Sequence, residues 1–167
     1  MATKKKSWQE KLKDSKDLPK VVKIEGKMSK RWLAGRSLGE GRGTGTCAIA
    51  SPMEVNNFMA KVPKGKVTTI NELRSAIAKK HQATIGCPIT TGIFAWISAN
   101  AAEEARGEGK KRITPWWRTL KGEGELNPKY PGGAQQQKTF LENECIKVAQ
   151  KGKKYKVEDL EKIIYKF

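Results

Sequence analysis

The chain has 167 residues, which is enough for one domain with a hydrophobic core, or for a domain with a tail. Its 34 lysine and arginine residues face 17 acidic ones, and the net charge of +17 makes nucleic acid the first partner to expect. A solvated cationic surface or a ribosome-associated protein is the alternative. No apolar run approaches the roughly 20 residues that cross a bilayer, and no apolar signal region follows the basic start, so neither a membrane span nor secretion is expected.

The thiols and the histidine do not predict a metal site. The chain has three cysteines, Cys47, Cys87 and Cys145, and their spacing is not that of metal ligands. It has one histidine, His81. We therefore expect no metal, no cofactor, and reduced thiols in the cytoplasm. In a bacterial source the protein would be associated with the nucleoid.

Residues 1–46 form a basic extension with too few large apolar side chains for a core of their own. Glycines recur from Gly35 to Gly45 and predict a flexible loop, in which Arg36 and Arg42 are available to phosphates. No Gly-Lys-Ser/Thr ending follows, so this loop is not interpreted as a nucleotide-binding loop.

Three helices are predicted in the middle of the chain. Ser51 caps a helix that begins at Pro52 and carries an apolar stripe up to Val62. A second helix begins after Thr69 with the same capping pattern. A third runs from Pro88 to about Arg106. The second and third helices have the order of a helix-turn-helix, although any helical bundle offers the same spacing.

The stretch Ile113–Thr119 holds adjacent tryptophans between a proline and an arginine. Flat rings beside a guanidinium group suit an unstacked nucleobase. The alternative is a tryptophan-rich loop packed against the core, and for either ring alone the two interpretations have similar weight.

The rest of the chain begins with a turn-rich segment over residues 120–133. A helix from about Ala134 to Glu144 is predicted to bury Phe140 and Leu141. Alternating segments around Lys151-Gly152-Lys153 predict a β-hairpin, and a short closing helix is expected over residues 157–167.

The order of these pieces resembles the DNA-binding domain of the alkylguanine-DNA alkyltransferases, also called methylated-DNA–protein-cysteine methyltransferases. Residues 62–69, Val-Pro-Lys-Gly-Lys-Val-Thr-Thr, are similar to the opening of that domain. Residues 115–118, Pro-Trp-Trp-Arg, stand where the family has Pro-Cys-His-Arg. Residues 130–133 are similar to its Tyr-x-Gly-Gly loop, and residues 140–144 to its closing Leu-Leu-x-x-Glu segment. The resemblance covers roughly residues 51–146.

This resemblance implies a mainly α fold with a short β-hairpin and a helix-turn-helix, winged-helix-like DNA-binding domain. It divides the chain into a basic extension (1–46), the alkyltransferase-like domain (47–146) and a C-terminal hairpin with a short helix (147–167). The DNA- and base-binding residues that we assign are Thr68, Thr69, Ile89, Thr90, Thr91, Pro115, Trp116, Trp117, Arg118, Tyr130, Gly132 and Gly133.

Departures from the family pattern determine the expected function. The family transfers an alkyl group from guanine to a cysteine thiolate, and Trp116 replaces that cysteine, so no transfer is expected here. Trp117 replaces the activating histidine, which leaves Glu144, the matching acid, with nothing to orient. The family's tyrosine and arginine finger are also missing: Ile70 stands at the tyrosine position, and Ile89 is offered as an apolar wedge in place of the arginine.

A tryptophan at the cysteine position is typical of the alkyltransferase-like proteins, which bind alkylated guanine in DNA and flag it for repair. We therefore expect a monomeric, non-catalytic protein that flips the damaged base of duplex DNA into a tryptophan-lined pocket and recruits nucleotide excision repair factors. One alternative is a general DNA- or RNA-binding module on the same scaffold. Others are an alkyltransferase with its nucleophile moved to Cys87, and a structural protein with an aromatic core.

Overall fold

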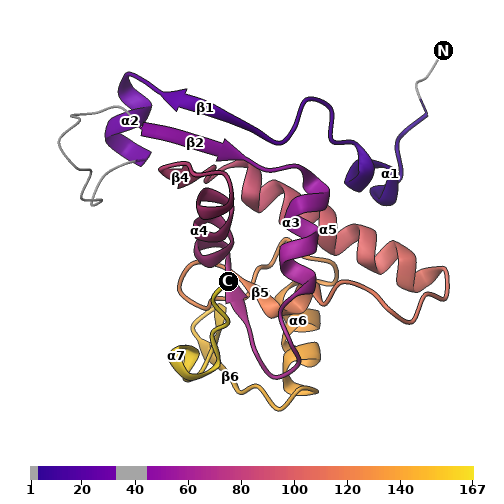
Figure 1. Ribbon diagram of the computed structural model, residues 1–167. Helices are drawn as coiled ribbons and strands as arrows, with labels where there is room; N and C mark the ends of the chain where they lie inside the picture. Colours follow the sequence, from indigo (N-terminus) through magenta and orange to yellow (C-terminus); the bar gives the residue numbers. More distant parts are fainter. Residues whose placement is uncertain (1–3, 33–44) are drawn as a thin grey trace.

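The computed structural model describes residues 4–32 and 45–167 (Figure 1). The predicted loop with Arg36 and Arg42 lies outside these residues. The helices are α1 (Trp8–Lys13), α2 (Lys27–Trp32), α3 (Pro52–Ala60), α4 (Ile70–Lys80), α5 (Thr90–Gly107), α6 (Gly133–Glu142) and α7 (Leu160–Ile163). The strands are β1 (Lys20–Ile24), β2 (Gly45–Ile49), β3 (Thr68–Thr69), β4 (Ile85–Gly86), β5 (Thr119–Leu120), β6 (Val148–Lys151) and β7 (Lys154–Val157). The expected mainly α class with a short hairpin is confirmed.

The central helices begin at the predicted caps. Ser51 Oγ accepts a hydrogen bond of 3.2 Å from the Glu54 amide, and Pro52 opens α3. Thr69 Oγ1 accepts from the Glu72 amide at the start of α4. Apolar side chains of α3, α4 and α5 then form one core, because each helix turns a stripe of such residues toward the other two.

The N-terminal segment adds a small sheet to this core. Strand β1 pairs antiparallel with β2, and β2 pairs parallel with β4, in the order β1-β2-β4. The sheet lies at the upper left of Figure 1, above α4. Gly86 of β4 lies against α4, where a Cβ atom would come within 2.4 Å of the Arg74 carbonyl oxygen, so only glycine allows this close approach.

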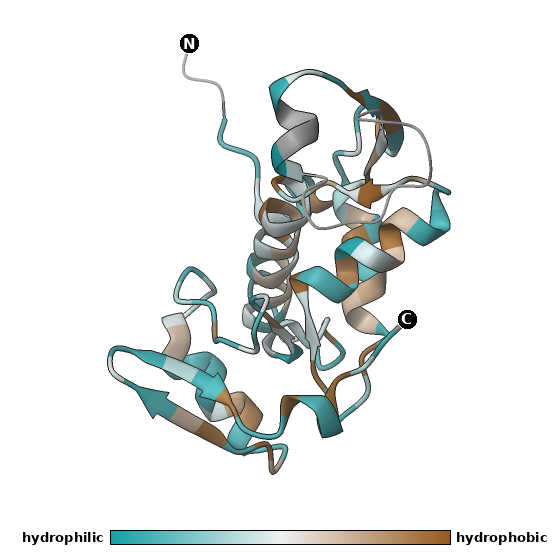
Figure 2. Cartoon of the chain, turned by 90° about the vertical axis from the view of Figure 1, so that its left-hand side faces the viewer, coloured by the Kyte–Doolittle hydropathy of each residue, from teal (hydrophilic) through white to brown (hydrophobic). Residues whose placement is uncertain are grey.

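The C-terminal hairpin packs on a second apolar cluster, in which Val157 meets Leu120, Leu126 and Leu141. Figure 2 shows that the hairpin becomes hydrophilic away from this base. The closing helix is shorter than predicted. Ile164 forms a bridge with Val67, and the Tyr165 amide donates to the Val67 carbonyl, so this part of the chain is extended instead of helical.

Candidate nucleic-acid interface

Trp116 is a core residue. Its exposed fraction is 0%, and its indole Nε1 donates a 2.9 Å hydrogen bond to Glu103 Oε1 of α5. The rings of Tyr130 and Phe140 pack edge-on against it, each with a centroid distance of 5.6 Å. Of the two interpretations of this ring, its position agrees with the packed loop: Trp116 holds the loop against the core, and its N–H has a partner inside the protein.

Trp117 lies nearer the surface and is partly buried. Its ring stacks on Phe140 with a centroid distance of 4.6 Å and an interplanar angle of 21°. Its Nε1 donates to Glu144 Oε1 over 2.9 Å. One face of this indole is therefore occupied by Phe140, and its polar edge by Glu144.

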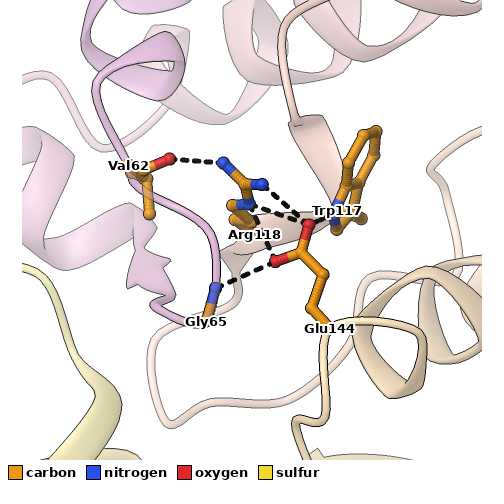
Figure 3. Close-up of polar contacts among 5 residues, drawn as sticks. All are labelled: Val62, Gly65, Trp117, Arg118 and Glu144. Atoms are coloured by element: carbon orange, nitrogen blue, oxygen red, sulfur yellow. Dashed lines mark hydrogen bonds and ion pairs between the residues drawn. The ribbon is translucent and has the colours of Figure 1, made fainter.

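Glu144 joins three parts of the chain (Figure 3). Besides Trp117, it accepts hydrogen bonds from Arg118 Nε and Nη2 and from the Gly65 amide, at 2.7 to 3.2 Å. Arg118 Nη1 also donates to the Val62 carbonyl at 2.6 Å. Two expectations are corrected here. Glu144 does have groups to orient, and the Arg118 guanidinium, assigned to DNA binding, is held largely buried by Glu144 and the Val62 carbonyl.

The same contacts set the ionisation of Glu144. Burial alone would raise its pKa, but the hydrogen bonds from Arg118, Trp117 and the Gly65 amide outweigh burial and lower the pKa below the ordinary value of 4.5. Glu144 is consequently a carboxylate at neutral pH.

The assigned threonines stabilise the backbone. Thr68 and Thr91 are buried, and their hydroxyls donate to the carbonyls of Tyr165 and Cys87. Thr69 caps α4 and is also buried. Thr90 is partly buried, with its Oγ1 shielded from solvent. These hydroxyls are therefore shielded from solvent.

The Tyr-Pro-Gly-Gly segment forms the turn into α6. Tyr130 is buried, which raises the pKa of its hydroxyl. Gly132 and Gly133 have φ angles of 73° and 72°, a conformation that favours glycine. Pro115, before the tryptophan pair, is also buried. This part of the family motif therefore has a structural role in the chain.

An open groove lies beside these buried residues, between the start of α4, the exposed face of α5 and residues 121–129. Ile89, Ile93 and Trp96 form its apolar side, with exposed fractions of 58%, 47% and 37%. They stand at spacings of four and three residues, so one face of the helix carries all three. Ile70 closes the end near α4. The groove has a volume of about 630 Å³, within the usual range for ligand sites.

Polar and cationic groups surround the apolar side of the groove. Asn71 and Asn127 supply amides, and Lys121 and Lys129 supply charges from the opposite wall. Lys121 also pairs with Glu125 at 3.1 Å. An apolar wall with an indole, faced by amides and ammonium groups, suits a nucleobase that is still attached to its phosphates.

A second hollow adjoins Ile89 on its other side. Arg31 of α2 and Arg74 of α4 line it, together with Pro88 and Ile89. Arg74 Nε donates to the Gly86 carbonyl at 3.1 Å. Two cationic side chains, from α2 and α4, thus line this hollow together with Ile89.

Of the assigned residues, Ile89 is the one that reaches the groove within the part of the chain that the structure describes. Sequence reasoning missed Ile93, Trp96, Asn127 and Lys129. A usable signal existed, because Ile89, Ile93 and Trp96 share one helical face while Phe94 packs against the core. Which of the two faces is buried depends on the packing partners of α5, and the sequence does not show those.

Cys87 ends the connection before α5 and is buried. Hydrogen bonds from the Cys47 thiol and from Thr90, against the effect of burial, lower the pKa of Cys87 to about 5. The distance from the Thr90 amide to Sγ is 3.5 Å. The surrounding Ile24, Cys47 and Ile85 cover this thiol, so an alkyl group on DNA has no direct approach to it.

Two features are absent from the described residues, 4–32 and 45–167. They contain no cluster of histidine, cysteine and acidic side chains suited to a metal ion. None of their helices combines the length and the apolar character that a membrane span needs.

Comparisons with known proteins complete the description of the chain. No protein-family model matches it, and no curated protein does so significantly. The crystal structure of S. pombe Atl1 in complex with damaged DNA containing O6-carboxymethylguanine is similar to it, with 22% identity and a TM-score of 0.49. A crystal structure of S. pombe ATL in complex with DNA has 19% identity and a TM-score of 0.43. Each comparison covers 69% of this chain and 94% of the other.

Proposed function

We propose that this protein binds duplex DNA without catalysis and recognises alkylated guanine by accepting the extruded base in the groove beside Trp96. The observation that carries the proposal is that the partly exposed Trp96 indole lines one groove together with the exposed Ile89 and with Lys121 and Lys129. The net charge of +17 supports a polyanionic partner. The motifs shared with the alkyltransferase-like proteins support damaged DNA as that partner.

The energies involved favour a damaged base. Extruding a base from a duplex costs a few kcal/mol, and less where pairing is already weakened. Stacking on an aromatic ring returns about 1–3 kcal/mol. Because the two quantities are similar, Trp96 would hold a weakened base out of the helix far more readily than a normal one. Ile89 would occupy the vacated step as an apolar wedge.

The absence of catalysis follows from the residue at the reactive position. An indole cannot serve as the thiolate nucleophile that alkyl transfer needs, and Trp116 is also buried. The proposed outcome of binding is recruitment of nucleotide excision repair factors to the lesion, by a protein that acts as a monomer in the cytoplasm or on the nucleoid.

A general DNA- or RNA-binding module is the second candidate. It is favoured by the engagement of Trp116 with Glu103 and of Arg118 with Glu144, since neither side chain is presented to a base or a phosphate. Such a module would use the cationic surface alone. Its affinity would be equal for damaged and undamaged DNA and would fall steeply with salt.

Equilibrium binding to two matched duplexes separates these candidates. One duplex carries a single O6-alkylguanine and the other carries guanine, and each is titrated at two salt concentrations. Damage recognition predicts tighter binding to the modified duplex, with a ratio of dissociation constants that persists at the higher salt. Equal dissociation constants at both salt concentrations would overturn the proposal in favour of the general module.

A further inference from the structure

The N-terminal helix α1 lies against the helix that forms the groove wall. The rings of Trp8 and Trp96 meet edge to face, with a centroid distance of 4.7 Å and an angle of 81°. Trp96 therefore has the groove on one side and Trp8 on another. Any change in the position of α1 changes the support of the indole that we assign to the base.

Polar contacts hold α1 in this position. The Glu104 carboxylate of α5 accepts hydrogen bonds from the amides of Trp8 and Gln9, at 3.3 and 2.8 Å. The Gln9 side chain contacts Glu108 and Lys110 at 2.9 and 3.1 Å. These contacts connect successive turns at the end of α5 to the first turn of α1.

The packing of α1 does not serve the hydrophobic core. None of the side chains that the structure describes in this helix is fully buried. A helix of six residues is also far too short to be stable alone in water. The contacts with α5 thus fix the position of a helix that adds little to the core. The reason for these specific contacts must therefore lie outside core packing.

The segment carries a dense group of positive charges. Lys4 and Lys5 precede α1 and are exposed. The Lys11 ammonium group lies 3.9 Å from the centre of the Trp8 ring, on the helix that touches Trp96. Lys6 is paired with Asp14 at 2.6 Å. Lys4, Lys5 and Lys11 thus place three ammonium groups on the segment that packs against Trp96.

We infer that residues 4–13 are a second DNA-contacting element, which binds duplex phosphates beyond the groove and supports Trp96 from behind. This inference rests on the proposed function for the location of the duplex. Phosphate contacts would come from Lys4, Lys5 and Lys11, and Glu104 and Trp8 would act as positioning residues. The partner chemistry is a phosphodiester backbone, which such ammonium groups bind without regard to sequence.

The phosphate contacts are tested with the triple variant K4Q/K5Q/K11Q of the full chain. Each phosphate contact contributes about 0.9 to the slope of log affinity against log salt, so we expect the slope for the undamaged duplex to fall by about 2 to 3. The matched control is K61Q/K64Q/K79Q, which removes three exposed lysines that do not line the groove, and should keep a slope nearer that of the wild type. Equal slopes for the two triple variants would overturn the inference.

The positioning role is tested with Glu104→Ala. Loss of a carboxylate near DNA should by itself strengthen binding to phosphates. If Glu104 holds α1 in place, binding to undamaged duplex should instead weaken several-fold, while circular dichroism shows a folded protein. Stronger binding would contradict the positioning role. Both tests use undamaged DNA, so they are independent of the preference for alkylated DNA that decides the proposed function.

Discussion

The indole Nε1 of Trp117 donates a 2.9 Å hydrogen bond to Glu144 Oε1, and the same carboxylate binds Arg118. In the alkyltransferase pattern that the motifs resemble, these positions hold a histidine and the acid that orients it. Here the acid serves a structural purpose, because it connects the tryptophan loop to the turn at Gly65 and to the end of α6.

Replacing Glu144 should therefore destabilise the fold. Glu144→Ala leaves the Arg118 guanidinium buried without its carboxylate, and we expect the free energy of unfolding to fall by about 3 kcal/mol. Urea denaturation measures this change. Glu142→Ala is the control, because Glu142 is more exposed and pairs with Lys138 at 3.7 Å, so its loss should cost under about 1 kcal/mol. Similar losses for the two variants would show that the Glu144 contacts do not stabilise the loop.

The stability of the protein should depend on the ionisation of Glu144. Its pKa is lower when folded, so its carboxylate stabilises the fold at pH values above 4.5, its ordinary pKa, and this contribution disappears as the pH falls through the folded pKa. The difference in unfolding free energy between wild type and Glu144→Gln should be constant near neutral pH and shrink as the pH falls below 4.5. A difference that stays constant down to pH 3 would contradict the lowered pKa.

Mutation of Trp116 should mainly reduce stability, whereas mutation of Trp96 should mainly reduce the preference for alkylated DNA. Trp116→Ala removes a fully buried ring and should cost about 3–5 kcal/mol of stability, whereas Trp96→Ala should cost far less because its ring is partly exposed. Trp116→Phe keeps most of the buried volume and should retain the preference for alkylated DNA. Thermal melting and duplex titration measure the two properties. A selective loss of that preference in a folded Trp116→Phe variant would return the binding role to Trp116.

The three thiols should differ in reactivity. Cys145 is exposed, while Cys47 and Cys87 are buried, so a thiol reagent should label one cysteine quickly in the native protein and all three after unfolding. Intact-mass measurement after incubation with O6-alkylguanine DNA should show no added alkyl group. An alkyl adduct on Cys87 would establish the alternative in which the nucleophile has moved there.

Much of the helical framework was predictable from local chemistry. Ser51 with Pro52, and Thr69 with Glu72, are capping patterns whose effect depends on a few neighbouring residues, and both helices begin where they predict. The hairpin around Gly152 follows from a similarly local pattern. The pairing of β1 with β2 joins distant segments, and no local signal specifies it.

The candidate site was harder to predict, for a physical reason. A pair of adjacent tryptophans before an arginine is equally compatible with a pocket that binds a base and with a loop that buried hydrogen bonds anchor to the core. The decision depends on Glu103 and Glu144, which lie 13 and 27 residues away from their tryptophan partners. The exposure of Trp96 likewise depends on how α5 meets α3, α4 and α1.

The most direct test of the base site is the ratio of dissociation constants for undamaged and O6-alkylguanine duplexes, measured for wild type, Trp96→Ala and Trp96→Phe. Tyr165→Ala, in the hollow between α3 and α4, is the aromatic control outside the groove. We predict a ratio that falls toward one in Trp96→Ala, is partly kept in Trp96→Phe, and is unchanged in Tyr165→Ala. A folded Trp96→Ala protein that keeps the full wild-type ratio would show that the base is bound elsewhere.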